Sequence, residues 1–319
     1  MTLADSLARA QGCLLGQLAG DSLGSLVEFA SAAAIASRFP RGLRDLADGG
    51  VWNTLAGQPT DDSEMALSLA RLLAQEGRYD ATRAREKYVE WFHSDPFDIG
   101  NTTASGLSGR PLSSSQANGA LMRISPLGIF GARHELAQVA AWARQDAAIT
   151  HPHPVCSDIN ALYAMAITEA VREGHPPAAL FDKICSWAEA PDYGEEVRTD
   201  LRSAAASRHP DPCLDGAQQG WVRFAFRNAL WQLLHAPDLE SGIVDTVMRG
   251  GDTDTTGAIC GALLGAVHGR EAVPQRWIDA ILNCRPAAGR PGVHQPRPEC
   301  YWPVDALELA ARLLGKLDR

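Results

Sequence analysis

The sequence contains no long apolar run, no closely spaced cysteine pair and no excess of basic residues, and each absence excludes a class of protein. No stretch of about 18 consecutive apolar residues occurs, so we expect no membrane span. The first residues, MTLADSLARAQGCLLGQLAG, lack the basic segment typical of a signal peptide. The seven cysteines are odd in number and include no CxxC, which excludes a disulfide framework or zinc finger and favours a reducing cytoplasm.

The charge balance is acidic. Against 38 Asp and Glu residues stand 29 Lys and Arg, for a net charge of −9, so the sequence predicts no broad nucleic-acid-binding surface. An anionic ligand would then have to be attracted locally, by helix N-termini or by bound metal.

Strand signals are also scarce. Asn118-Gly119 is a hairpin-type dipeptide, but its flanks do not alternate apolar and polar residues.

Helical periodicity is present along almost the whole chain. It predicts helices over residues 4–24, 30–38, 61–76, 80–93, 134–147, 155–173, 177–188, 194–206, 220–236, 240–249, 255–268, 274–283 and 304–317. Loops are expected at 40–60, 95–119, 207–219 and 285–303. The last loop is rich in proline and arginine, which is typical of a flexible linker. Its Tyr301 and Trp302 could instead stack on a flat ring.

Two predicted helices carry glycine at every fourth position. Gly12, Gly16, Gly20 and Gly24 form one ladder, and Gly257, Gly261, Gly265 and Gly269 form the other. A glycine inside a helix costs about 1 kcal/mol relative to alanine, so another interaction must offset that cost. Glycine at this spacing makes a flat face that a second backbone can approach closely. We therefore expect helices 4–24 and 255–268 to be central and adjacent.

Two short acidic segments stand immediately before helical patterns. They are Thr60-Asp61-Asp62 and Asp252-Thr253-Asp254-Thr255. If the two helix starts meet in the fold, four carboxylates converge, and such like charges need compensation. Carboxylate and hydroxyl oxygens are ligands for Mg²⁺ or Mn²⁺ rather than for Zn²⁺ or Cu²⁺.

Helix capping is the alternative interpretation of these segments. Asp and Thr are common first residues of helices, and Asp61-x-x-Glu64 resembles a capping box. Capping requires one carboxylate per helix, however, whereas each segment offers two. The duplication favours a metal site.

Six segments, in order along the chain, resemble the ADP-ribosylglycohydrolase family, and in particular its dinitrogenase reductase-activating type. They are GCLLGQLAGDSLGSLVEF, PTDDSEMALSLARLL, DPFDIGNTT, NGALMRISPLGIF, THPHPVCSDINAL and GGDTDTTGAICGALLGAVHG. Together they span most of the chain. The resemblance implies an all-α fold, a single domain over residues 1–319, and a binuclear centre of two Mg²⁺ or Mn²⁺ ions.

The resemblance also implies roles for individual residues. The implied metal ligands, direct or through water, are Thr60, Asp61, Asp62, Asp252, Asp254 and Thr255. The implied catalytic residues are Glu28 and Asp98, of which Glu28 is a ligand in some family members. The residues implied to line the substrate cleft are Gly100, Asn118, Gly119, Met122, His151 and His153.

Structural interpretations of several residues stay open. Glu28 could end a helix in solvent, and Asp98 could cap a turn. His151 and His153 are each followed by proline and lack the helical i, i+4 spacing of zinc ligands. Arg123 could bind a phosphate or form a buried ion pair.

The resemblance implies a hydrolase that removes ADP-ribose from a modified protein side chain, with arginine as the first expectation. Cleavage at the distal ribose passes through an oxocarbenium-like state, and a carboxylate can act as general acid or base. The alternatives are another linkage (serine, a nucleobase or acetylated ADP-ribose), a non-catalytic ADP-ribose-binding or structural protein, and a two-metal phosphoesterase. We expect a cytoplasmic monomer whose partners are ADP-ribosylated protein and ADP-ribose, without membrane or nucleic acid.

Overall fold

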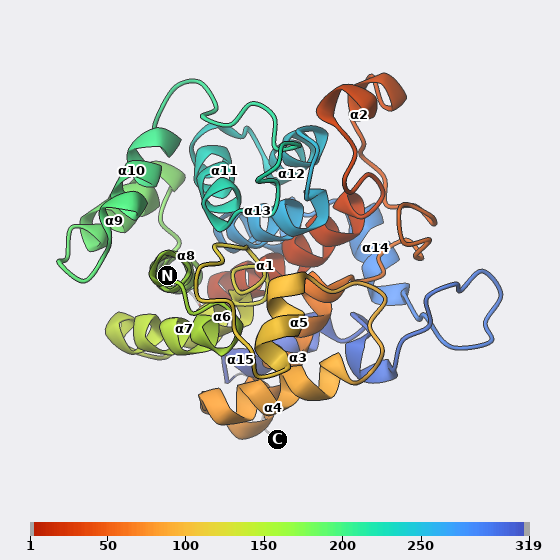
Figure 1. Ribbon diagram of the computed structural model, residues 1–319, viewed down its shortest axis with the longest axis horizontal. Helices are drawn as coiled ribbons and strands as arrows, with labels where there is room; N and C mark the ends of the chain where they lie inside the picture. The colour runs from red at the N-terminus through yellow and green to blue at the C-terminus, as the bar shows by residue number, and fades with distance from the viewer. Residues whose placement is uncertain (1–2, 316–319) are drawn as a thin grey trace.

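Two helices at the centre of the molecule pack against each other along the glycine ladders. The structure is a computed structural model that describes residues 3–315, and in it α1 (Leu3–Gly24) lies beside α13 (Thr253–His268), as Figure 1 shows. A Cβ atom on Gly16 would lie 2.1 Å from the carbonyl oxygen of Gly261. No side chain fits between the two backbones, so this close approach requires glycine. The predicted adjacency of the two helices is confirmed.

The direction of this pair decides which residues meet at its ends. Gly12 faces Gly265 at one end, and at the other end a Cβ on Gly24 would lie 2.2 Å from the Thr253 carbonyl oxygen. The helices are therefore antiparallel, and the end of α1 meets the start of α13. Because Glu28 follows α1 and the second acidic segment begins α13, the ladder packing brings acidic residues from both ends of the chain together.

The other helices surround the central pair (Figure 1). α8 and α11 contact α13, α12 packs on the same helix, and α3 and α15 contact α1. In chain order the surrounding elements are α2 (Ala32–Arg38), α3 (Asp61–Glu76), α4 (Ala81–Phe92), α5 (Asn101–Leu107), α6 (Ser125–Gly131), α7 (Leu136–Thr150), α8 (Pro154–Glu173), α9 (Pro177–Ala188), α10 (Glu195–Ala204), α11 (Val222–His235), α12 (Leu239–Met248), the 3₁₀ turn Arg270–Ala272, α14 (Gln275–Asn283), the 3₁₀ turn Glu299–Tyr301 and α15 (Ala306–Leu313).

The all-α prediction is confirmed, and the described residues form one compact domain. Within 3–315, β-structure is limited to three isolated bridges, Ser31–Gly250, Gly49–Thr54 and Ala117–Trp221. The predicted helices 61–76 and 177–188 have the observed bounds. The last helix, expected over 304–317, begins at Ala306, and residues 316–317 lie outside the described part. In that part of the chain, no helix has the length and apolar character needed to cross a membrane.

Two short helices were not predicted. α5 lies inside the expected loop 95–119, and α6 lies in a stretch where no helix was expected. Their sequences, NTTASGL and SPLGIFG, contain glycine, threonine and proline, which have low helix propensity. Packing stabilises them instead. A Cβ on Gly106 would lie 2.6 Å from Thr150 Cα, and one on Gly128 would lie 2.7 Å from the Ile167 side chain.

The expected loop 285–303 is not a free linker at its C-terminal end. Arg297 and Tyr301 are buried, and the guanidinium of Arg297 lies 5.1 Å from the centroid of the Tyr301 ring. The indole N–H of Trp302 donates to the Arg297 carbonyl oxygen at 2.8 Å. Both aromatic side chains are therefore used in packing, and the linker interpretation is wrong for this end of the segment.

Candidate active site and metal centre

A cavity of about 410 Å³ lies where the end of α1 meets the starts of α3 and α13. Most of the predicted site residues line it, namely Glu28, Asp61, Asp98, Gly100, Asn118, Gly119, Met122, His151, Asp252, Asp254 and Thr255. Thr60 and Asp62 are fully buried and are not part of the lining. His153, Tyr301 and Trp302 are also absent from the lining.

Three carboxylates approach one another closely at this cavity. One oxygen each of Glu28, Asp98 and Asp254 lies within 4.8 Å of the other two. They come from the turn after α1, the connection between α4 and α5, and the first turn of α13. Asp61 and Asp252 line the same cavity. The two acidic segments therefore converge as predicted, and the two expected catalytic residues lie beside the expected ligands.

Burial and mutual repulsion raise the pKa values of these carboxyl groups. Burial raises the pKa of Glu28 to about 8, and the charges of Asp98 and Asp252 add to the shift. Burial likewise raises the pKa of Asp98 to about 9, with Asp61 and Asp252 adding their charges. The pKa of Asp61 rises to about 8 through burial and then through the charge of Glu28. Such a cluster stays ionised at neutral pH only if a cation compensates the charge.

Two buried carboxylate oxygens lack a hydrogen-bond donor among the described residues. They are Asp62 Oδ1 and Asp254 Oδ2. Buried polar atoms are nearly always paired, so unpaired oxygens at a shared acidic site indicate a missing partner. The donor set consists of carboxylates and threonine hydroxyls, which are the hard ligands that Mg²⁺ and Mn²⁺ prefer. The residues present therefore fit a hard divalent cation.

Asp21 explains why the first acidic segment is not used for capping. Thr60 is the N-cap residue of α3, but its side chain makes no capping bond. Asp21 on α1 accepts from the Thr60 N–H at 3.2 Å, from the Ser63 N–H at 3.1 Å and from the Thr60 hydroxyl at 2.9 Å. Asp61 and Asp62 are thus not needed as caps, and although Asp62 Oδ2 lies 3.0 Å from the Thr60 hydroxyl, Asp62 Oδ1 stays available for a ligand. Asp21 was not predicted, although an acidic residue between two glycines of an apolar ladder, Gly20 and Gly24, is a usable signal.

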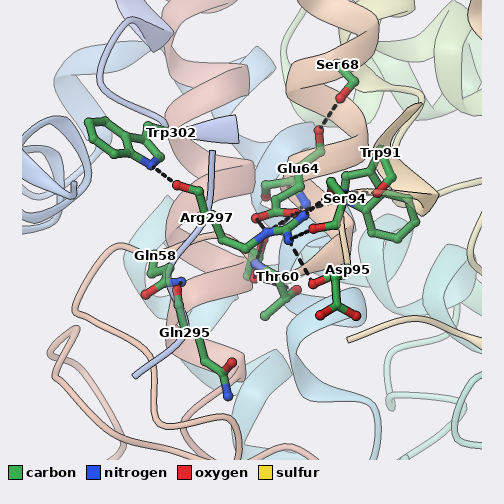
Figure 2. Close-up of polar contacts among 12 residues, drawn as sticks. Gln58, Thr60, Glu64, Ser68, Trp91, Ser94, Asp95, Gln295, Arg297 and Trp302 are labelled. Carbon is green, nitrogen blue, oxygen red and sulfur yellow. Dashed lines mark hydrogen bonds and ion pairs between the residues drawn. The ribbon is translucent and has the colours of Figure 1, made fainter. Parts of the chain in front are cut away.

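Glu64 does not complete a capping box either. Arg297 Nε donates to Glu64 Oε1 at 2.8 Å, and the Trp91 indole N–H donates to Glu64 Oε2 at 2.8 Å. Figure 2 shows the guanidinium between Glu64 and the Ser94 region. The capping-box interpretation is therefore wrong, because Glu64 anchors a different segment of the chain.

Specific donors orient the carboxylates at the cavity. Asn118 Nδ2 donates to Asp252 Oδ2 at 2.6 Å. The indole N–H of Trp52 donates to Glu28 Oε2 at 2.6 Å. Glu28 is only 6 % exposed, so the solvated-terminus interpretation is wrong. No sequence pattern singled out Trp52, which lies in the expected loop 40–60.

A chain of hydrogen bonds assigns the protonation of His151. Arg123 Nη1 donates to Thr150 Oγ1 at 2.9 Å, and Thr150 Oγ1 lies 2.7 Å from His151 Nδ1. Because the guanidinium can only donate, the hydroxyl proton is directed to Nδ1, and Nε2 carries the ring proton. Nε2 is buried without a partner among the described residues. Burial and the Arg123 charge lower the pKa of His151 to about 3, so the ring is a neutral donor.

Arg123 and His153 support the site from behind the cavity wall. Arg123 is fully buried, with Nε 3.0 Å from Asp146 Oδ1, so the buried ion-pair interpretation is confirmed. His153 Nδ1 accepts from the Val155 N–H at 3.2 Å at the start of α8. Its Nε2 lies 3.3 Å from Gln116 Nε2. A direct ligand contact for His153 stays a prediction.

Comparison with known proteins agrees with the resemblance. The sequence profile of the ADP-ribosylglycohydrolase family matches residues 2–316. The ADP-ribosyl-[dinitrogen reductase] glycohydrolase of Rhodospirillum rubrum is 32% identical over 283 residues, covering 86% of this chain and 90% of that protein. The ADP-ribosylarginine hydrolase Tri1 of Serratia proteamaculans is 27% identical, covering 88% and 76%.

A solved structure described as an ADP-ribosylglycohydrolase-related protein complex superposes with a TM-score of 0.79 and 26% identity. The superposition covers 98% of this chain and 99% of the other. With a family profile that matches nearly every residue and a relative at 32% identity, the chain belongs to the ADP-ribosylglycohydrolase family.

Proposed function

We propose that the protein is a divalent-metal-dependent hydrolase that releases ADP-ribose from a modified protein side chain, with ADP-ribosylarginine as the expected substrate. One observation carries the proposal: carboxylates from the ends of α1, α3 and α13 face one cavity, and buried oxygens of Asp254, in its lining, and of Asp62, beside Asp61 on α3, are unpaired. The choice of arginine is supported by the name of one relative, an ADP-ribosylarginine hydrolase, and the choice of a protein substrate by that of another, an ADP-ribosyl-[dinitrogen reductase] glycohydrolase.

The proposed centre holds two Mg²⁺ or Mn²⁺ ions. The proposed ligands are Thr60, Asp61, Asp62, Asp252, Asp254 and Thr255. When bound, the ions would supply positive charge that binds the vicinal hydroxyls of the distal ribose and lowers the pKa of a water. Asp21 would support the ligands by fixing the start of α3 through the bonds it accepts from the Thr60 N–H, the Thr60 hydroxyl and the Ser63 N–H.

Glu28 and Asp98 are proposed for the proton transfers. The bond broken joins the anomeric carbon of the distal ribose to the side-chain nitrogen, and the new bond joins that carbon to a water oxygen. The water loses a proton and the leaving nitrogen gains one, which requires a base and an acid. Both carboxyls line the cavity. The negative charge of the carboxylate that acts as the base also stabilises the positive charge that develops on the ribose ring.

Other residues of the cavity lining, Gly100, Asn118, Gly119, Met122 and His151, are proposed to bind the rest of ADP-ribose, together with His153, which lies outside the lining. The Nε2–H of His151 is a neutral donor that suits a phosphate or hydroxyl oxygen. A Cβ on Gly119 would lie 2.7 Å from Thr103 Oγ1 and 3.0 Å from the His151 ring, so the wall requires glycine at this position.

The proposed setting is a reducing compartment such as the cytoplasm. All seven cysteines are free, and four of them are buried, including Cys13 and Cys260 in the central helices. Free, buried cysteines are typical of a protein whose stability does not depend on disulfide bonds. The monomeric state stays a prediction.

A chromatographic assay on defined substrates tests the proposal. ADP-ribosylated arginine, ADP-ribosylated serine and acetylated ADP-ribose are incubated with the protein and Mg²⁺, Mn²⁺ or a chelator. We expect intact ADP-ribose to be released, fastest from arginine, and only with metal. Release of AMP would identify a phosphoesterase instead. Binding of ADP-ribose without any product would identify a non-catalytic binder, and full activity after exhaustive chelation would exclude the metal centre.

A further inference from the structure

The segment 295–297 lies outside the lining of the candidate active site and contacts residues that hold two of its carboxylates. Arg297 is buried and forms an ion pair with Glu64, which lies one turn after Asp61 on α3. Figure 2 shows the Arg297 side chain extending from its segment to the Glu64 carboxylate on α3. The segment belongs to the proline- and arginine-rich part of the chain, 285–303, which contains none of the residues proposed to bind metal or substrate or to transfer protons.

The guanidinium of Arg297 also holds the backbone that leads to Asp98. Nη1 donates to the carbonyl oxygens of Ser94 and Asp95 at 2.8 and 3.0 Å. Nη2 donates to Ser94 Oγ at 2.7 Å and to Glu64 Oε2 at 2.9 Å, while Nε donates to Glu64 Oε1. All five N–H donors are therefore used, in a planar fork that a lysine cannot reproduce.

This part of the backbone needs an anchor. Asp95 has a φ of +56°, a left-handed conformation that costs free energy in a residue other than glycine. Asp98 follows in the same connection and is held within 4.8 Å of the Glu28 and Asp254 oxygens. The Arg297 bonds to the Ser94 and Asp95 carbonyl oxygens hold the backbone that leads to this position.

Gln295 provides a second link, to Glu28. Gln295 Nε2 donates to the Trp52 carbonyl oxygen at 3.0 Å, and Gln58 Nε2 donates to the Gln295 carbonyl oxygen at 2.7 Å. The Trp52 indole N–H in turn donates to Glu28 Oε2. The Trp52 ring also lies 6.0 Å from that of Phe97, next to Asp98. One short segment thus braces the residues behind both carboxylates.

We propose that Gln295 and Arg297 are positioning residues for the active site, holding Glu28 through Trp52 and Asp98 through the Ser94–Asp95 backbone. The inference rests on the proposed hydrolase function. Neither residue lines the cavity, so each acts through others. A displacement of about 1 Å at a reacting group lowers a rate by up to about 100-fold, so bracing of this kind is expected to act on kcat.

The test uses variants that keep the buried charge balanced. Glu64→Gln/Arg297→Met removes both charges of the ion pair and still leaves an amide oxygen to accept the Trp91 N–H. Gln295→Ala removes only the link to Trp52. The matched control is Arg71→Met. Arg71, also on α3, donates to the Trp302 carbonyl oxygen at 2.8 Å and pairs with Asp305, so it ties the same helix to the same C-terminal region without touching Ser94, Asp95 or Trp52.

We measure kcat, KM, the affinity for ADP-ribose, and hydrogen exchange of the amides at 97–100. In the double variant we expect kcat to fall at least about tenfold, with KM and ADP-ribose affinity changed less than threefold, and exchange to accelerate. Gln295→Ala should lower kcat about threefold or more. Arg71→Met should leave kcat within twofold and hydrogen exchange at 97–100 unchanged, even if its melting temperature falls as far as that of the double variant.

Two outcomes would overturn the positioning role of Gln295 and Arg297, and the two can be distinguished. If the parent protein is active and the double variant keeps its kcat, or Arg71→Met loses as much, the segment is merely structural. If the parent releases no ADP-ribose from any substrate, the proposed function itself fails, and the role fails with it.

Discussion

Gly16 and Gly261 face each other across the two central helices with no room for a side chain on either residue. A Cβ on Gly261 would lie 2.0 Å from the Gly16 carbonyl oxygen, and one on Gly16 would lie 2.1 Å from that of Gly261. Because the antiparallel pair ends where Glu28 and the second acidic segment meet, this contact also sets the spacing of the candidate site. The packing offsets the intrinsic cost of glycine inside a helix.

Gly261→Leu is therefore expected to destabilise the fold. Backbone atoms block the new side chain, so the helices must separate, and overpacking of this kind lowers the free energy of unfolding by about 1–3 kcal/mol or more. Gly261→Ala should act in the same direction, since even the Cβ has no space. Urea unfolding measures both. Gly216→Ala is the control, because no atom lies within 4 Å of that Cβ. An unchanged melting temperature in Gly261→Leu would contradict close packing.

The sequence predicted the central part of the fold because its two signals, periodicity and glycine spacing, are local. Helix 61–76 was found with the observed bounds because its apolar residues recur over four turns and Gly77 ends it in a left-handed conformation. α5 and α6 could not be found this way. Each has seven residues, too few for a period, and each depends on a partner distant in sequence, such as Thr150 for Gly106.

The site was predictable where the residue type itself indicates chemistry. Paired aspartates indicate a metal site, and most of the predicted residues line the cavity. Residues that act through distant contacts were not predictable. Asp21 reaches the start of α3, and Arg297 reaches Ser94, through folding that no local pattern encodes. A buried arginine in a proline-rich segment resembles a linker residue until its partners are known.

His151→Ala is expected to weaken ADP-ribose binding. The ring offers a buried Nε2–H to the cavity, and loss of a hydrogen bond to a charged oxygen costs about 1.5–3 kcal/mol. Calorimetry with the metal-loaded protein should show this as a weakening of roughly 10- to 100-fold. His153→Ala is the comparison, since His153 caps α8 and does not line the cavity. Equal losses in both variants would place His151 among structural residues.

The metal-free protein is expected to lose stability as pH rises from about 7 to 9. A carboxyl whose pKa is raised by folding binds more protons when folded, so its stabilisation is complete below the unfolded pKa near 4 and is lost as pH approaches the folded value. That value is about 8 for Glu28 and Asp61 and about 9 for Asp98. His151 does not contribute in this window, because burial and the Arg123 charge lower its pKa to about 3 and the pKa of an unfolded histidine is about 6.5.

Calorimetric melting in a chelator measures this loss. Mg²⁺ or Mn²⁺ should raise the melting temperature more at about pH 9 than at pH 7, because the ionised carboxylates bind the cation more strongly. Asp61→Asn should flatten the pH dependence of the metal-free protein. A melting temperature that rises over this window in the chelated parent, and equally in Asp61→Asn, would show that the cluster carries no repulsion.

Substitutions at Asp254 and Glu28 separate ligand from proton carrier. Asp254→Asn keeps the shape of the side chain but removes the charge and its unpaired oxygen, so we expect both bound metal and turnover to be lost. Glu28→Gln keeps the Trp52 hydrogen bond, because the amide oxygen still accepts. If Glu28 mainly transfers protons, elemental analysis will find metal at the parental ratio while kcat falls by about 100-fold or more.

If Glu28 is instead a ligand, metal will be lost together with activity. The position of Glu28 makes either role chemically reasonable, since its oxygen lies within 4.8 Å of those of Asp98 and Asp254. Asp98→Asn provides the complementary measurement. A carboxylate that carries a proton should lose kcat while the protein keeps its metal, so each variant assigns the role of its own carboxylate. Parental kcat in both variants would show that neither carries a proton, and full activity in Asp254→Asn would exclude the binuclear mechanism.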